Sequence, residues 1–223
     1  MRLLLLLFAA AQPAEASLRL SGEVNAVSDY RYRGISRSGE EAALQGNLHV
    51  AHGSGAYAGV WGSSLREQSR LGDAELNFYA GYDTDIASGT TIDGGLLYYA
   101  FPDSRDGASD YFEPYAKLSH SLGPARATIG AAYAWDQRAL ADSDNLYLWT
   151  DLSAGIPTTP LTIKAHVGRS DGGLTQGRAY VDWSLSAEAA FGALTVGAAY
   201  VDTDLGALRD ADGGVILSLG FAF

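Results

Sequence analysis

The last ten residues, GVILSLGFAF, alternate large apolar side chains with small or polar ones up to the terminal carboxylate. A period of two places every second side chain on one face of a β-strand. A free apolar strand at the edge of a soluble sheet invites aggregation, whereas the last strand of a closed membrane barrel has no free edge and faces lipid. The segment therefore predicts a strand that closes a barrel; an ordinary buried strand is the alternative. The apolar face of the segment comprises Val215, Leu217, Leu219, Phe221 and Phe223.

The first sixteen residues have the pattern of a cleaved signal peptide. Arg2 precedes an apolar run from Leu3 to Ala11, and Ala14-Glu15-Ala16 matches an A-x-A cleavage site. The run is too short to cross a bilayer as a helix. We therefore expect an exported chain that starts near Ser17, with residues 17–223 forming a single outer-membrane β-barrel domain.

Composition excludes several classes of protein. No segment after the signal approaches 18 consecutive apolar residues, so the sequence predicts no transmembrane helix there. The chain has no cysteine, which excludes disulfides and thiolate metal sites. The net charge of −11 argues against nucleic acid as a partner, because such binding needs a basic surface.

Strand-like alternation recurs about twelve times along the chain. In the segment 73–83 one face carries Ala74, Leu76, Phe78, Ala80 and Tyr82, and the other carries Asp73, Glu75, Asn77, Tyr79, Gly81 and Asp83. Helical spacing would scatter these carboxylates around the axis, so a strand is favoured. The third and eleventh segments have mixed faces, and their register is not determined by the pattern.

The links between these segments alternate between short turns and longer polar stretches. Gly, Pro, Ser and Thr mark the short links, which the sequence predicts at 52–55, 87–89, 121–124, 157–160 and 192–193. A barrel with short periplasmic turns and longer extracellular loops produces this order. The sequence thus predicts an all-β fold, a transmembrane antiparallel up-and-down β-barrel of about 12 strands.

Aromatic residues cluster near both ends of the predicted strands, as in the aromatic girdles of membrane barrels. The predicted girdle beside the long loops comprises Tyr30, Tyr32, Trp61, Tyr98, Phe101, Tyr133, Trp135, Trp149 and Tyr200. The predicted opposite girdle comprises Tyr82, Phe191, Phe221 and Phe223.

The runs SDYRYRGISRSGEEAALQGN, GAYAGVWGSSL, AELNFYAGYD and IDGGLLYYAFPD resemble the TorF-type porin family of Gram-negative outer-membrane proteins, whose function is largely undefined. The resemblance covers nearly the whole mature chain and is most specific at Asp29, Tyr30, Arg33, Gly34, Gln45, Gly46, Tyr57, Gly59, Trp61, Gly62, Glu75, Tyr79, Gly81, Asp93, Tyr111 and Glu113. Asn77 stands where an acidic residue is expected, and 138–175 match only in outline. The resemblance implies an outer-membrane barrel that acts as a channel, and it supplies no catalytic residues.

Charged side chains on the inward face favour a water-filled lumen, because they fit neither lipid nor a dry interior without partners. An acidic excess there favours cations. The sequence therefore predicts a porin that passes small hydrophilic solutes or ions passively with a mild cation preference. The candidate pore-lining residues are Glu23, Asp29, Arg31, Arg33, Glu75, Asp93, Glu113, Lys117, Arg126, Lys164, Asp182 and Glu188.

Three alternatives remain open at this stage. Inward charges that pair across the lumen would make a closed, stabilising plug. A lipid-modifying enzyme would need a Ser activated by a His, but no GxSxG motif occurs; His52 and His120 are expected at the surface, and His49 and His166 in the lumen. An adhesive barrel would use its loops, which are short, and the acidic segment 202–214 lacks EF-hand spacing.

The expected partners follow from this fold. They are outer-membrane lipid and lipopolysaccharide, the barrel-assembly machinery through the C-terminal Phe223, and small solutes or ions. No nucleic acid, cofactor, metal ligand or catalytic residue is predicted.

Overall fold

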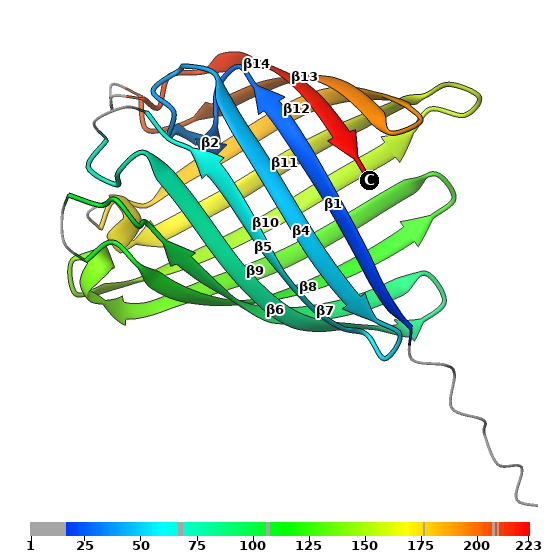
Figure 1. The fold of residues 1–223 in the computed structure, drawn as a ribbon, viewed down its shortest axis with the longest axis horizontal. Coiled ribbons are helices and arrows are strands. Elements are labelled where there is room, and N and C mark those ends of the chain that lie inside the picture. Colours follow the sequence, from blue (N-terminus) through cyan, green and yellow to red (C-terminus); the bar gives the residue numbers. More distant parts are fainter. Residues whose placement is uncertain (1–16, 67–68, 106–107, 176, 207, 209) are drawn as a thin grey trace, which may run out of the picture.

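The computed structural model describes residues 17–66, 69–105, 108–175, 177–206, 208 and 210–223. Twelve strands form one closed barrel in which every pair of neighbours is antiparallel (Figure 1). The predicted closed barrel of about twelve strands is confirmed, whereas the predicted signal peptide at 1–16 lies outside the described residues. The barrel strands are β1 (Leu18–Val27), β4 (Ala43–His52), β5 (Ala56–Ser64), β6 (Ala74–Ala87), β7 (Thr90–Ala100), β8 (Tyr111–Leu122), β9 (Ala125–Gln137), β10 (Ser143–Gly155), β11 (Leu161–Gly172), β12 (Tyr180–Phe191), β13 (Leu194–Thr203) and β14 (Gly214–Ala222).

The barrel closes where the first strand, β1, pairs with the last, β14. The backbone N–H groups of Gly22 and Phe223 each donate to the other's carbonyl oxygen at 2.9 Å. The Phe223 ring lies directly over Gly22, since a Cβ atom on Gly22 would stand 2.6 Å from Phe223 Cζ. The C-terminal aromatic residue is therefore part of the seam that removes the free edges of the sheet.

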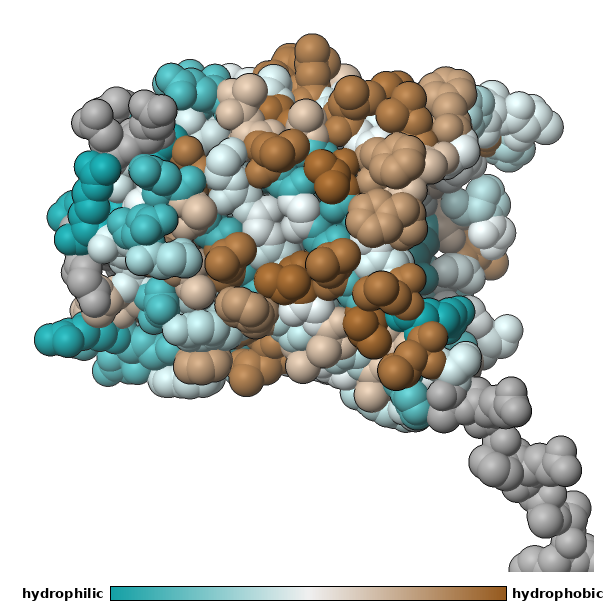
Figure 2. Space-filling model, in the orientation of Figure 1, coloured by the Kyte–Doolittle hydropathy of each residue, from teal (hydrophilic) through white to brown (hydrophobic). Residues whose placement is uncertain are grey.

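The two faces of the wall differ as the alternation predicts. In β6, Glu75 is fully buried inside the barrel, while Phe78 is 48% exposed on the outside. In β14, Val215 and Leu217 point outward and are mostly exposed. Hydrophobic side chains spread over the visible part of the wall, and the end that carries the long loops is mostly hydrophilic (Figure 2). This outer surface suits acyl chains and is unsuited to water.

The structure also shows the faces of the two mixed segments. In β5, Tyr57 and Trp61 point inward, since the ring of Trp61 contacts Tyr30 and the Tyr57 ring contacts His49. In β13, Val196 and Tyr200 are exposed on the outside.

Two kinds of link join the barrel strands. The short turns at one end span residues 53–55, 88–89, 123–124, 156–160 and 192–193. The longer links at the other end span residues 28–42, 65–73, 101–110, 138–142, 173–179 and 204–213. Ser17, the first described residue, and Phe223 both lie toward the short-turn end. The expected alternation of link lengths holds except at 138–142, which is no longer than 156–160. This link is short because β9 and β10 extend into residues 135–145, a polar stretch that the sequence predicts to be a loop. Among the described residues, no helix is long and apolar enough to cross a membrane.

The predicted outer girdle is partly wrong. Tyr133, Trp135 and Tyr200 are exposed on the wall as expected, and Tyr98 stacks beside Phe112 on that face. However, five of the predicted girdle residues point into the barrel, namely Tyr30, Tyr32, Trp61, Phe101 and Trp149. Trp61 and Trp149 occupy inward positions of their strands, and the other three lie on or beside loops that turn inward. At the opposite end, Tyr82, Phe191, Phe221 and Phe223 are exposed.

A small apolar core fills the long-loop end of the barrel interior. Its buried members are Tyr30, Ala43, Leu65, Tyr99, Phe101, Tyr111, Ala134 and Leu140. The wall contributes Tyr99 and Tyr111, whose rings stack at 4.4 Å between centroids, and the loops contribute Tyr30 and Leu65. The loops therefore pack into the barrel instead of extending away from it.

We expect Gly22→Ala to lower the free energy of unfolding by about 1 kcal/mol, because the new methyl group displaces the Phe223 ring from the seam. Urea unfolding in lipid vesicles measures the change. Gly155→Ala is the matched control, since nothing lies within 4 Å of a Cβ at that position. In a Phe223→Ala background the Gly22→Ala penalty should vanish; an undiminished penalty would show that the ring does not cause it.

Candidate functional site

The first long loop, 28–42, folds into the barrel as a small hairpin. Its strands are β2 (Arg31–Tyr32) and β3 (Ile35–Ser36), which pair with each other only. The turn between them needs positive φ at two successive residues, and Arg33 (50°) and Gly34 (82°) provide it. A Cβ on Gly34 would lie 2.9 Å from the Cβ of Asp182 in β12, so only glycine lets the hairpin approach the wall this closely.

Arg33, at the tip of the hairpin, reaches across the lumen to the wall. Its Nη2 donates to Glu113 Oε2 of β8 at 2.6 Å, and both side chains are almost fully buried. The guanidinium lies over the Tyr147 ring at 4.1 Å from the centroid. The Tyr180 hydroxyl donates to the Arg33 carbonyl at 3.1 Å. Three strands, β8, β10 and β12, thus hold one arginine of the loop.

Arg37 makes a second attachment, just after β3. Its Nη1 donates to Glu75 Oε2 of β6 at 2.5 Å, and its guanidinium lies 3.8 Å above the Tyr32 ring. Glu75 is completely buried and also accepts from the Tyr30 hydroxyl and from Asn77 Nδ2. These hydrogen bonds replace the water contacts that the buried Glu75 carboxylate has lost.

The two loop residues that contact Glu75 have shifted pKa values. Burial acts to lower the pKa of the Arg37 guanidinium, but Glu75 and the neighbouring tyrosines together outweigh it, and the pKa lies well above its usual value. Burial raises the pKa of the Tyr30 hydroxyl well above the usual range. Arg37 is therefore a permanent cation, and Tyr30 is a neutral hydrogen-bond donor.

Asp29 organises the base of the hairpin. Its carboxylate accepts from the hydroxyls of Ser36 and Ser38 at 2.5 and 3.0 Å, and from Arg31 Nε at 2.6 Å. The Ser38 hydroxyl accepts in turn from the Tyr30 backbone N–H at 2.8 Å. The loop is thus cross-linked within itself as well as to the wall.

Twelve residues were predicted to line the lumen. Three of them, Asp29, Arg31 and Arg33, lie on the inward-folded loop and not on the wall. The others lie on inward positions of the barrel strands: Glu23, Glu75, Asp93, Glu113, Lys117, Arg126, Lys164, Asp182 and Glu188.

Most of the inward charges in the remainder of the lumen are paired. Lys117 Nζ lies 2.7 Å from Asp93 Oδ2, and Lys164 Nζ lies 2.6 Å from Glu188 Oε2. His166 lies between two carboxylates, with Nδ1 at 2.6 Å from Asp151 and Nε2 at 3.1 Å from Asp182. 

The four histidines lie where the sequence predicts. His49 and His166 point into the lumen, where they contact Tyr79 and Tyr147. His52 and His120 are at the short-turn end, and their Nδ1 atoms contact Ser54 and Thr90 in exposed hydrogen bonds.

Sequence reasoning missed several residues of this site. Arg37 was not chosen, because nothing local in the sequence points its loop toward Glu75. The inward tyrosines Tyr99, Tyr111 and Tyr147 were also missed, although strand alternation places them on the same face as Asp93, Glu113 and Asp151, respectively. Tyr57 hydrogen-bonds to Tyr115 and to Asp93 in the same way. A systematic count of aromatic residues on the inward face would have found them.

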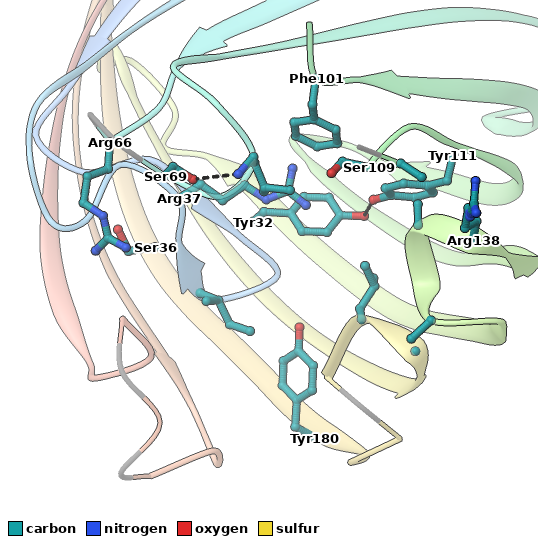
Figure 3. A pocket seen from close by; sticks show the side chains of 17 residues that line it. Tyr32, Ser36, Arg37, Arg66, Ser69, Phe101, Ser109, Tyr111, Arg138 and Tyr180 are labelled. Atoms are coloured by element: carbon teal, nitrogen blue, oxygen red, sulfur yellow. Dashed lines mark hydrogen bonds between the residues drawn. The ribbon is translucent and has the colours of Figure 1, made fainter. Parts of the chain in front are cut away.

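Three cavities surround the hairpin. Two of them, of about 430 and 350 Å³, contact Arg33 and lie along the lumen on either side. The largest, of about 730 Å³, opens at the long-loop end and includes Tyr32, Arg37 and Tyr111 (Figure 3). No group of three or more His, Cys, Asp or Glu residues suited to a metal ion occurs in the part of the chain that the structure describes.

We expect Glu113→Gln to release the hairpin, because it leaves the buried Arg33 guanidinium without a counter-charge. Removing one partner of a buried pair costs roughly 3 kcal/mol, or about a 100-fold rise in the detached population. Trypsin cleavage after Arg31, Arg33 or Arg37 measures it, since these bonds are accessible only when the loop leaves the barrel.

Glu188→Gln is the matched control. It breaks a wall pair whose side chains are a third to a half exposed, and such pairs contribute at most about 1 kcal/mol. Equal cleavage rates in the two variants would contradict the assigned role of Glu113.

The fold matches solved outer-membrane channels. The NanC porin superposes with a TM-score of 0.63 at 14% identity, over 92% of this chain and 99% of that one. The KdgM porin, solved in complex with disordered oligogalacturonate, gives a TM-score of 0.63 at 7% identity, over 91% and 98%. An outer-membrane channel from Pseudomonas putida F1 gives a TM-score of 0.52 at 11% identity, over 96% of this chain and 99% of that one. At these identities the likeness shows the fold.

Comparison of sequences adds a family but no activity. No sequence among the curated proteins matches this chain. Residues 10–212, most of the chain, match a family described as bacterial protein of unknown function (Gcw_chp). The chain belongs to the Gcw_chp family, and its barrel has the fold of outer-membrane porins.

Proposed function

We propose that the protein is an outer-membrane channel that passes small hydrophilic solutes or ions by passive diffusion. The observation that carries the proposal is the inversion of the wall, apolar outside and charged inside, in a closed barrel of twelve strands. Eight strands leave an interior filled by side chains and sixteen leave a broad aqueous channel, so twelve suit a narrow passage.

We propose an outer-membrane location for this channel, with the export, assembly and lipid contacts that such a location requires. Residues 1–16 would direct export and be removed, Phe223 would be recognised by the barrel-assembly machinery, and the outer wall would contact lipid and lipopolysaccharide. The likeness of the sequence to TorF-type porins supports this setting, as does the fold of the NanC porin.

The hairpin β2–β3 would form the constriction of the channel. It crosses the lumen from Asp182 on one side to Glu113 on the other, and cavities of about 430 and 350 Å³ flank it. Those cavities support a narrow pore. A closed barrel in which the hairpin acts only as a plug is the competing proposal, supported by the two buried ion pairs of Arg33 and Arg37.

Ion pairing limits the charge selectivity. Arginine or lysine pairs with Glu75, Asp93, Glu113 and Glu188, and the acidic excess comprises Glu23, Asp83 and the two carboxylates around His166. Arg19 and Arg126 oppose them. A small acidic excess gives the mild cation preference that we propose.

A catalytic role has less support. His52 Nδ1 lies 2.7 Å from the Ser54 hydroxyl, but among the described residues no carboxylate hydrogen-bonds to that imidazole. The pair belongs to a tight turn, where such contacts are local. An oligosaccharide accompanies the KdgM porin, and it supports a hydrophilic cargo over a lipid substrate.

Replacing residues 31–36 with a Gly-Ser segment of equal length should raise the single-channel conductance several-fold, because the constriction is removed. Purified protein in a planar bilayer measures it. The control is Lys164→Gln with Glu188→Gln, which removes a wall pair without touching the hairpin and should change conductance little. If the wild-type protein conducts no current and the variant conducts, the hairpin is a plug. If neither protein conducts current, the channel proposal is refuted.

Charge selectivity can be tested by paired substitutions of opposite sign. We expect Glu23→Gln with Asp83→Asn to reduce the cation preference, and Arg19→Gln with Arg126→Gln to increase it. Reversal potentials across a salt gradient report both. A shift in the same direction for the two variants would contradict control by luminal charge.

A further inference from the structure

The largest cavity lies above the hairpin, at the long-loop end of the barrel. It measures about 730 Å³, within the range of sites that hold small organic molecules. Five of the six links at this end contribute to its lining, and β8 and β12 add Tyr111 and Tyr180. Figure 3 shows Tyr32, Arg37 and Tyr111 near its centre, with Arg66 and Arg138 on opposite sides.

The charge of this cavity is opposite to that of the whole chain. Its described lining includes three arginines, Arg37, Arg66 and Arg138, and no aspartate or glutamate, although the chain carries a net charge of −11. The described lining residues of the cavity thus carry only positive charges, in a chain that is acidic as a whole.

Two of these arginines are each held by a carboxylate that uses only some of their N–H donors. Arg37 uses Nη1 for Glu75, and Arg66 uses Nη1 for Asp210 at 3.1 Å. A guanidinium has five N–H groups, so a single-nitrogen contact leaves donors for a ligand. Arg138, on the 3₁₀ turn Arg138–Leu140, is exposed and forms no ion pair with another described residue. 

The remainder of the lining suits the body of an organic ligand. Phe101, Leu71 and Leu174 provide apolar contacts, while Tyr32 and Tyr111 provide rings whose hydroxyls contact each other at 3.3 Å. Serine hydroxyls from three loops, Ser36, Ser69 and Ser109, add polar atoms. A bare inorganic anion would leave this apolar and aromatic surface unused.

We propose that this cavity binds small organic carboxylates that carry a ring, with the carboxylate held by the arginines and the ring against the aromatic side chains. Arginine recognises carboxylates with directional, charge-assisted hydrogen bonds. The inference rests on the proposed channel function and deepens it, because it assigns the class of solute that the mouth captures.

Isothermal titration of the full, detergent-solubilised protein tests the ligand class. Benzoate and glucuronate are the probes with an aromatic and a pyranose ring, benzamide lacks the charge, and acetate lacks the ring. We expect at least one ring carboxylate to bind about tenfold or more tightly than both benzamide and acetate. Equal binding of benzamide, or tighter binding of phenyl phosphate, would overturn the carboxylate assignment.

Variants test the location. Arg66→Gln with Arg138→Gln should weaken the binding of the ring carboxylate about tenfold or more, since two charge-assisted contacts are lost. Arg169→Gln is the matched control, because Arg169 is exposed on the outer wall at the same end and outside the cavity. Equal losses in both variants would show a general charge effect and refute the site.

The binding assay does not depend on conduction, so the two proposals can fail separately. Binding that is lost in the double variant, from a protein that conducts no current, would keep the site and refute the channel. A conducting protein that binds no ring carboxylate would keep the channel and refute the site.

Discussion

Closure of the sheet is the constraint on which the whole structure depends. In lipid every backbone N–H and C=O group must find its partner within the protein, so a single unpaired edge is costly. The pairing of β1 with β14 removes both edges, and the reciprocal bonds of Gly22 and Phe223 complete it at the last residue of the chain. Once the sheet is closed, the alternation of each strand determines which side chains meet lipid and which meet the lumen.

The lumen then raises the opposite problem, because it gathers charged groups in a small space. Glu75 and Glu113 are almost completely buried, and the wall supplies no basic residue beside them. The first long loop supplies the cations, and the attraction of Arg33 and Arg37 to these carboxylates holds the hairpin inside. The hairpin that occupies the lumen thus also supplies the counter-charges for the buried carboxylates.

The wall could be predicted from the sequence, and the interior could not. Leu76 and Glu75 differ so strongly in polarity that alternation alone assigns their faces. Alternation does not assign the faces of Trp61 and Tyr98, because an aromatic ring suits both a membrane interface and a packed lumen. The path of the first loop depends on carboxylates about forty to eighty residues away on β6 and β8, and local pattern contains no information about such distant pairs. The tight turn at Arg33-Gly34 was not predicted either, and a turn alone would not reveal the direction of the loop.

The distribution of charge along the barrel axis connects these features. The chain as a whole is acidic, and some luminal carboxylates pair with a cation on an adjacent strand, as Asp93 does with Lys117 and Glu188 does with Lys164. Of the arginines at the mouth, Arg37 and Arg66 have carboxylate partners that lie outside the cavity lining, and Arg138 has none among the described residues. Because screening by salt weakens interactions beyond about 10 Å, a solute at the mouth responds mainly to these arginines and only later to the acidic residues below the hairpin. The proposed ion preference and the proposed solute capture therefore depend on different parts of one lumen.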